Sequence, residues 1–499
     1  ASNVAIGAAA LDANTTGAEN TAIGRDSLGA NTTGANNVAN GYGALTNNTT
    51  ASYNVAVGHN ALNDNTTGSN NTSVGYASLA VNTTGADNTA VGSGCLDANT
   101  TGNDNVALGR LALEFNTTAD DNVAIGFIAM RYNTTGGFNT AVGSRALGAN
   151  TTASLNTAVG YEALKSNTTG DSHTAVGKDS LKSNTTGRFN CALGYESLAL
   201  NTTGTYNVAV GKAALYANTT ASNNTAVGYN SLTANTTGLR NTAVGQAALQ
   251  SHTTGANNSA FGCRALQNST TAEENTAYGF EGLFSTTTGN YNTSVGGGAL
   301  FANTTASYNT AVGKNALRTN TTGQYNSASG FGALGVNTTG TDNTAIGINA
   351  GYTTTTGNYL TILGSNARSN TATNDRENVI GYNVMGAGGN HSTIGFNTSK
   401  SYMIQGGTSW TAGSDQRLKY NIETSTAGLS FVNDLRPVTY EWKAEQDVPS
   451  ELGHYKEGST ARVNGTDKVQ HGFIAQEVKA AIDSHSEIKN GHGMWNELS

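Results

Sequence analysis

The sequence predicts a mainly β chain. A repetitive parallel β-roll or β-solenoid shaft, homotrimeric and built from a 17-residue repeat, precedes a small α+β C-terminal domain. Three observations predict this fold class: a repeat that keeps its register for over 300 residues, the absence of proline before Pro437, and a change of composition at Ser414. The expected domains are the repeat shaft over 1–357, an irregular β transition segment over 358–413 and the C-terminal domain over 414–499.

The repeat has the pattern N-T-T-G-x-x-N-T-A-V-G-x-x-A-L-x-x. Its first Asn falls at Asn14, Asn31 and onward in steps of 17, and the register holds to Thr354 without insertion or deletion. A fixed period of this length is typical of solenoids. Each repeat has only about two large apolar residues, too few for a core of its own, so stacked repeats are expected to share one. At ~4.8 Å per coil, such a stack would be roughly 100 Å long.

One glycine of the repeat is invariant. It recurs from Gly7 to Gly347 in 21 copies, which indicates a positive φ or a backbone approach that excludes a Cβ atom. The three residues before it, as in Thr242-Ala243-Val244, predict a short β-strand. Its branched residues would lie on one face and its small residue on the other. A Leu four residues after the glycine supplies the remaining apolar side chain.

A second Asn precedes each strand from Asn3 to Asn343, and His173 is the one exception. Two interpretations are open: a ladder in which each side-chain amide donates to the next carbonyl along the axis, or a simple turn. The ladder is favoured, because a turn would also accept Asp, Ser or Gly. The Thr-Thr-Gly segment then forms the corner between coils.

Composition excludes several classes of function. The net charge of −8 does not fit a nucleic-acid-binding surface, and no apolar run approaches the ~20 residues of a membrane helix. The cysteines Cys95, Cys191 and Cys263 occupy different repeat positions, which favours buried free thiols over disulfides. The eight His are scattered, so no metal and no cofactor is expected. No recurring pair of acidic residues indicates a glycosidase.

The strand segments carry a first resemblance. Asn3-Val4-Ala5-Ile6-Gly7 and its equivalents resemble the S-V-A-I-G motif in the heads of trimeric autotransporter adhesins. Those heads are left-handed parallel β-rolls that associate as trimers. The likeness covers about one third of each repeat, and the period differs, so it implies a trimeric β-roll rather than a particular function.

The C-terminal segment is of a different kind. It has 22 charged residues in 86, against 36 in the preceding 413, which indicates a small α+β domain. Residues 429–435 predict a short helix that ends before Pro437, and alternating apolar residues over 438–442 predict a strand. Ile474, Val478 and Ile482 recur at helical spacing.

Three strings in this segment carry the second resemblance. They are S-D-Q-R-L-K-Y-N-I at 414–422, L-R-P-V-T-Y-E-W-K at 435–443 and H-G-F-I-A-Q-E-V at 471–478. In this order they resemble the intramolecular chaperone domain of phage endosialidases and related tail fibres. The resemblance implies a domain that trimerises, guides folding of the preceding shaft and then cuts itself off. It implies Ser414 as the nucleophile, Lys419 as the general base and Gly413–Ser414 as the scissile bond.

The implied chemistry makes demands on these residues. A Ser hydroxyl needs a base, and a Lys serves as one only when burial or a nearby positive charge, such as Arg417, lowers its pKa. Five residues separate Ser414 and Lys419, so a bend or a neighbouring protomer must bring them together. The family continues into a long C-terminal helix, which we expect to be missing after Ser499.

The sequence therefore predicts a structural trimeric fibre of a bacteriophage tail, located on the virion tail and extracellular. The expected partners are two further copies, a host cell-surface receptor with carbohydrate as one option, and the virion tail through a missing N-terminal region. A single self-cleavage is the only enzymatic step expected, and no nucleic-acid partner or membrane insertion is expected. The alternative is a cellular trimeric adhesin or surface filament carrying the same chaperone.

Aromatic residues recur at two outward repeat positions, as at Tyr42, Tyr161, Tyr291 and Tyr308. They would either stack against sugars or fill half-buried β positions, and the second interpretation is favoured.

Overall fold

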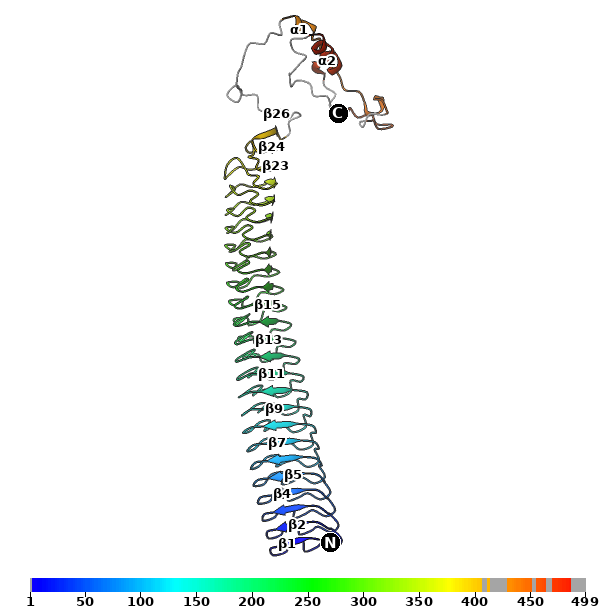
Figure 1. Cartoon of the computed structure of the whole chain (residues 1–499), viewed down its shortest axis with the longest axis vertical. Helices are drawn as coiled ribbons and strands as arrows, with labels where there is room; N and C mark the ends of the chain where they lie inside the picture. The colour runs from blue at the N-terminus through cyan, green and yellow to red at the C-terminus, as the bar shows by residue number, and fades with distance from the viewer. Residues whose placement is uncertain (1, 406–410, 413–428, 451–454, 464–468, 486–499) are drawn as a thin grey trace. The chain divides into compact units, whose positions relative to one another are not determined.

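The computed structural model describes residues 2–405, 411–412, 429–450, 455–463 and 469–485. The chain divides into two compact units, Ala1–Ala412 and Gly413–Ser499. The first unit is a parallel β-solenoid and the second contains a two-stranded sheet and short helices (Figure 1). The predicted fold class, a mainly β shaft followed by a small α+β region, is confirmed.

The shaft contains one three-residue strand per coil (Figure 1). The strands are β1 (Val4–Ile6), β2 (Thr21–Ile23), β3 (Val38–Asn40), β4 (Val55–Val57), β5 (Thr72–Val74), β6 (Thr89–Val91), β7 (Val106–Leu108), β8 (Val123–Ile125), β9 (Thr140–Val142), β10 (Thr157–Val159), β11 (Thr174–Val176), β12 (Cys191–Leu193), β13 (Val208–Val210), β14 (Thr225–Val227), β15 (Thr242–Val244), β16 (Ser259–Phe261), β17 (Thr276–Tyr278), β18 (Thr293–Val295), β19 (Thr310–Val312), β20 (Ser327–Ser329), β21 (Thr344–Ile346), β22 (Thr361–Leu363) and β23 (Asn378–Ile380).

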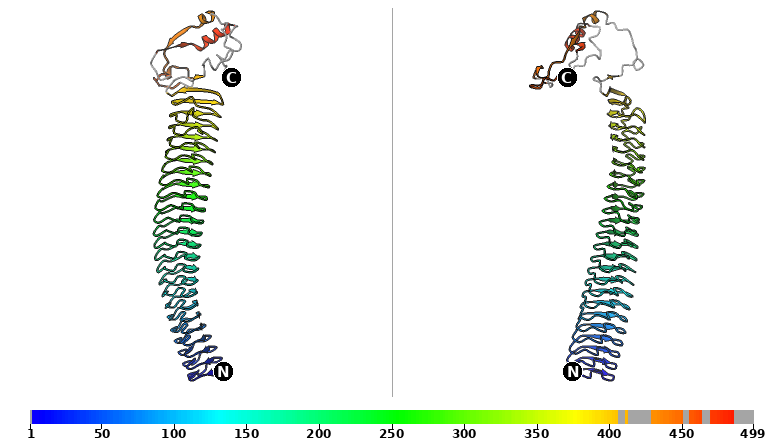
Figure 2. Two further views of the ribbon diagram at one scale, coloured as in Figure 1. Left: turned by 90° about the vertical axis from the view of Figure 1, so that its left-hand side faces the viewer. Right: turned by 180° about the vertical axis from the view of Figure 1, so that it is seen from behind.

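Each strand pairs in parallel with the strand 17 residues further on, so that equivalent positions lie above one another. In β9 and β10, for example, Ala141 pairs with Ala158. Figure 2 shows the strands stacked along one side of a gently curved shaft. Because the coils repeat without a slip, each side chain of the motif forms a continuous column along the shaft.

The 17-residue pairing extends two coils further than expected. The sequence pattern predicted loss of the period from Asn358, but Thr344 pairs with Thr361, and Thr361 pairs with Asn378. The expectation of an irregular segment from this point was wrong for these two coils. Gly364 and Gly381 keep the positive φ of the invariant column. The backbone geometry of the coil is therefore retained where most residues of the repeat motif have been replaced.

The coil then shortens. β24 (His391–Phe396) pairs with β23 at a spacing of 14 residues, as in Asn378↔Ser392. It continues into antiparallel pairing with β25 (Ser399–Ile404), which in turn pairs with β26 (Thr411–Ala412). The parallel coils therefore end in a small antiparallel sheet.

The core of each coil is thin. Its buried members are the central strand residue, a small residue and the Leu after the glycine, as in Ala141, Ala146 and Leu147, all fully buried. The branched residues Thr140 and Val142 lie on the outer face, half-buried. Only one large apolar side chain per coil thus enters the core. Of the cysteines, Cys95 is buried, whereas Cys191 and Cys263 are half-buried, which corrects the expectation that all three are buried.

The invariant glycine meets both predicted demands. Gly177 has φ +129°, and a Cβ on it would lie 2.5 Å from the carbonyl oxygen of Gly194 in the next coil. The Leu column also lies in the left-handed region, with φ of 50° at Leu147. A left-handed backbone is costly for a branched side chain, so the presence of Leu did not predict this conformation. The backbone N–H of Leu147 donates to the oxygen of Ala163 in the next coil, 2.9 Å away.

Both Asn columns form ladders. The predicted ladder of the second Asn is confirmed in a modified form: Asn139 Oδ1 accepts from the backbone N–H of Asn156 at 3.0 Å, and its Nδ2 donates to the oxygen of Ala153 at 2.9 Å. The first Asn of the motif forms a direct side-chain ladder that the sequence analysis missed. In it Asn150 Nδ2 donates to Asn133 Oδ1 at 2.8 Å. The buried amides of both columns therefore have partners in neighbouring coils. The exceptions among the described residues are Asn235 Oδ1 and Asn337 Oδ1, where His252 and Thr354 replace the next Asn.

His173 takes the place of Asn in the second ladder. Its Nδ1 accepts from the backbone N–H of Asn190 at 3.2 Å, and its Nε2 lies 2.7 Å from the oxygen of Gly187. A neutral imidazole with its proton on Nε2 satisfies both contacts. Burial lowers the pKa of His173 to about 4, because the charged form would lose its hydration.

The second unit has five described elements. They are α1 (Leu429–Asp434), β27 (Pro437–Tyr440), a short 3₁₀ helix η2 (Glu445–Asp447), β28 (Gln470–Phe473) and α2 (Ala475–Ser484). β27 and β28 form an antiparallel pair. Both predicted helices and the predicted strand are present within a residue or two of the expected bounds, although Trp442 lies beyond the end of β27.

We predict that Gly177→Val prevents normal stacking at one coil, because the new side chain would collide with the Gly194 backbone and be held at a positive φ. The apparent melting temperature should fall and the yield of folded protein should drop. The control is Gly297→Val, since a Cβ there would meet no atom closer than 3.9 Å, and Phe280 and Lys314 occupy the equivalent position in the neighbouring coils. Equal melting of Gly177→Val and wild type by circular dichroism would contradict the close approach.

A second prediction concerns pH. The folded pKa of His173, about 4, lies below the ordinary value of 6.5, so its contribution to stability is complete above pH 6.5 and declines as pH falls toward 4. His173→Asn should remove this part of the acid sensitivity, so the melting-temperature difference between variant and wild type should widen from pH 7 to pH 4. His59→Asn, at an exposed histidine, should leave that difference unchanged. A constant difference for His173→Asn would contradict burial of the neutral form.

Candidate functional site

Two of the three strings that carry the chaperone resemblance meet in the second unit. β27 lies in the second string and β28 begins just before the third, and they pair antiparallel with Pro437 opposite Phe473 and Thr439 opposite His471. The third string continues directly into α2. Residues distant in the sequence are therefore brought together by one hairpin-like pair of strands.

An ion pair joins the same two strings. The Arg436 guanidinium contacts both carboxylate oxygens of Glu477, with Nε–Oε2 at 3.0 Å and Nη2–Oε1 at 2.5 Å. Hydrogen bonding to Arg436 lowers the pKa of Glu477. The pair is largely exposed, so its contribution to stability is small, but its two-pronged geometry fixes α2 relative to the start of β27. Both residues lie within the recognised strings, but they are 41 positions apart and no local pattern predicts that they pair.

The two helices share a small apolar contact. Phe431 of α1 and Ala481 of α2 are buried together, with Leu435 and Ile482 packed beside them. Several other apolar side chains of this unit are exposed in the isolated chain, among them Leu429, Val432 and Phe473. Exposed apolar side chains of this kind, among the described residues of the unit, are typical of a surface that contacts a partner.

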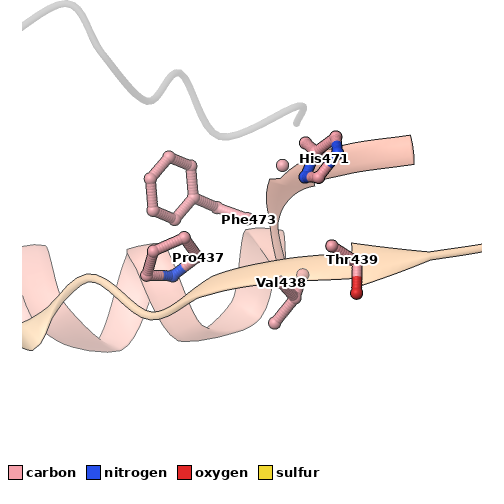
Figure 3. Close-up of a pocket in the computed structure, with 6 residues that line it drawn as sticks. Pro437, Val438, Thr439, His471 and Phe473 are labelled. Atoms are coloured by element: carbon pink, nitrogen blue, oxygen red, sulfur yellow. The ribbon is translucent and has the colours of Figure 1, made fainter. Parts of the chain in front are cut away.

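An open pocket lies over the strand pair. Figure 3 shows Phe473 beside Pro437, and His471 on the neighbouring strand above Thr439. Val438 and Gly472 complete the lining of this cavity of about 430 Å³. Among the described lining residues, His471 is the one titratable side chain and Thr439 the one hydroxyl.

The predicted catalytic residues Gly413, Ser414 and Lys419, and the neighbouring Arg417, lie outside the described residues. Their roles stay predictions. Among the described residues, no group of three or more His, Cys, Asp and Glu side chains could hold a metal ion. In that same part of the chain, no helix has the length and apolar character needed to span a membrane.

Several aromatic rings of the shaft stack on rings or cations of the neighbouring coils. Tyr308 stacks on Tyr291 and on Tyr325, with centroids 5.0 and 5.1 Å apart. Lys178 lies between Tyr161 and Tyr195, at 6.0 and 5.5 Å from the ring centres. The expectation that these rings fill half-buried β positions was wrong, because Tyr161, Tyr291 and Tyr308 are exposed and lie outside the strands. Their stacking on neighbouring coils covers part of the ring faces that a sugar would need.

The fold and the paired motifs define a fibre-type protein: a long parallel β-solenoid followed by a small separate domain. Residues 414–486 match the family model described as chaperone of endosialidase, so the resemblance inferred from the three strings is confirmed for the C-terminal domain. No curated protein and no solved structure matched the chain. The protein therefore combines a β-solenoid shaft with a C-terminal chaperone-of-endosialidase domain.

Proposed function

We propose that this protein is a trimeric fibre of a bacteriophage tail that adheres to the host surface, and that its C-terminal domain chaperones trimer folding before releasing itself by autoproteolysis. The observation that carries the proposal is the match of residues 414–486 to the chaperone of endosialidase, on a chain whose preceding part is a β-solenoid of 23 in-register parallel strands. A chaperone at the end of such a shaft could fix the register in which three copies align.

The outer strand face supports assembly. Each of β1–β23 presents its first and third residues outward, and none of these is charged. Branched apolar residues dominate the third position, and several, such as Val295, Val312 and Ile346, are exposed in the single chain. An uncharged, partly apolar face that runs along the whole shaft is typical of a protein–protein contact surface. Association of copies through this face would remove it from water.

The repeat supports identical partners. A surface that recurs every 17 residues along the shaft matches, coil for coil, only a surface with the same spacing. A second and third copy in parallel provide that spacing around a three-fold axis. The same regularity permits wrong registers, because a shift by one coil still matches most contacts.

This ambiguity is what a chaperone would resolve. Parallel coils pair residues across copies, and such non-local registration is slow and prone to error. A C-terminal domain that trimerises first would fix the register at one end of the shaft, and the coils would then stack from there. Release of that domain would leave the shaft kinetically trapped.

The release step is assigned to Ser414 and Lys419. Neutral Lys419 would take the proton of the Ser414 hydroxyl, whose oxygen attacks the Gly413 carbonyl carbon. The Gly413–Ser414 amide bond breaks, and the Ser414 nitrogen leaves as an amine after protonation. Water then hydrolyses the resulting ester and leaves a carboxylate on Gly413. One water molecule is consumed in a single turnover.

We predict that charge on the strand face blocks assembly. Three adjacent coils would receive Val142→Glu, Val159→Glu and Val176→Glu. Three buried carboxylates per copy would cost several kcal/mol each in a packed interface, so the trimer should be lost in sedimentation velocity runs.

The control places the same charges on an exposed column of the same coils, where Glu19 and Glu274 occur naturally. Its changes are Phe138→Glu, Leu155→Glu and Ser172→Glu. This variant should remain trimeric. Equal assembly of both variants would argue against the strand face as the contact.

Autoproteolysis gives the next prediction. The protein should split into a shaft ending at Gly413 and a fragment starting at Ser414, as measured by intact mass. Ser414→Ala and Lys419→Ala should leave the chain intact yet trimeric, because folding precedes cutting. Ser430→Ala and Lys443→Ala serve as controls and should be cut normally. Cleavage before residue 414 in Ser414→Ala would remove that residue from its role, and a shaft that assembles equally well without 414–499 would refute the chaperone.

A further inference from the structure

The repeat departs from its pattern where the shaft ends. The column that holds a buried Leu in earlier coils, as in Leu317 and Leu334, continues as Gly351, Arg368 and Met385. Arg368 and Met385 form a parallel bridge, so they still lie above one another in the coil stack. Arg368 is half-buried and Met385 is exposed. A column that is apolar and buried along the shaft thus becomes polar and accessible in the last coils.

These departures line a notch of about 190 Å³. Its lining residues are Arg368, Asn383, Met385, Asn397, Thr398 and Lys400. Arg368 Nη1 donates to Asn383 Oδ1 at 3.3 Å, and Asn383 Nδ2 donates to Asn397 Oδ1 at 3.1 Å. The polar side chains therefore converge from two coils and from the turn between β24 and β25.

The two cations of the notch lack a carboxylate partner among the described residues. Lys400 Nζ donates to the backbone oxygens of Met385 and Gly386, at 2.7 and 3.1 Å. Arg368 uses one guanidinium nitrogen for Asn383. The acidic Glu377 is fully buried and engaged with Ser369 and the Gly388 N–H. Two positive charges without a direct ion pair among the described residues thus line one small cavity, and buried Glu377 acts on Lys400 only through its electrostatic field.

We propose that this notch binds a carboxylate-bearing sugar unit, an inference that rests on the proposed adhesive function and gives it a receptor class. The guanidinium of Arg368 and the ammonium of Lys400 suit a carboxylate. The Asn397 amide and the Thr398 hydroxyl suit ring hydroxyl groups. Met385 supplies apolar contact for the C–H face of a sugar.

The position in the fold fits this role. The notch lies in the last parallel coils, between β22 and β25, at the end of the shaft opposite the N-terminus (Figure 1). The donors of the notch have bonding capacity left: two guanidinium nitrogens of Arg368 and one of the three ammonium protons of Lys400. A trimer would present three such sites.

The test uses saturation-transfer NMR on the trimeric protein with glucuronate, glucose and inorganic sulfate as probes. Glucuronate should give a signal, and glucose should give none at equal concentration. Arg368→Ala and Lys400→Ala should each weaken glucuronate binding about ten-fold, the usual loss for a hydrogen bond to a charged group. Thr398→Ala, at an exposed residue that the fold does not need, should weaken it about three-fold. Arg318→Ala, which removes a shaft arginine from beside Phe301, is the matched control and should bind normally.

Undiminished binding by Arg368→Ala, or equal binding of glucose, would overturn the inference. Displacement of glucuronate by sulfate at equal concentration would also overturn it, because it would reveal a simple anion site. Sedimentation of the same samples separates the two proposals. A trimer that does not bind glucuronate refutes the notch alone, whereas a monomeric protein refutes the fibre function.

Discussion

The close approach of one coil to the next at the invariant glycine column is the constraint on which the shaft depends. The core of each coil holds only one large apolar residue, such as Leu147, and the other buried side chains are small or polar. At this spacing two columns of buried Asn reach their partners in adjacent coils. If the coils separated, the buried amides would lose their hydrogen bonds together, and each loss is costly in a dry interior. Stability is thus distributed along the axis rather than held in one centre.

Much of this could be predicted from the sequence, because a strict period turns each residue into a column. The invariant glycine indicated a positive φ and a close approach between coils. The alternation in Thr-Ala-Val indicated a strand with Ala on the inner face and the branched residues on the outer face. The first Asn column was missed because an Asn beside Thr-Thr-Gly fits a corner equally well. The left-handed Leu column was missed because residue type does not favour it; coil-to-coil hydrogen bonds impose it. The end of the parallel coils was predicted too early, because the backbone pairing continues for two coils after the sequence motif is lost.

The C-terminal domain could be predicted in a different way. Its helices and strand followed from apolar spacing, but its chemistry rests on resemblance to the chaperone of endosialidase, since no spacing argument brings Ser414 to Lys419. The Arg436–Glu477 pair links two of the recognised strings, and no local pattern announces a contact between residues 41 apart in the sequence. The notch around Arg368 was also invisible as a motif. It becomes visible only as a departure from the repeat, once the fold shows which residues share a column.

Regular stacking gives many equivalent registers between copies of the shaft, and we propose that the chaperone domain selects one of them. The central claim is that three copies stack in parallel, in one register, with their uncharged strand faces together. Cryo-electron microscopy of the purified protein tests this most directly. The account predicts three solenoids related by a three-fold axis, with coils ~4.8 Å apart and β1–β23 facing the partner chains. A single unpartnered solenoid, or a trimer whose strand faces point to solvent, would contradict it.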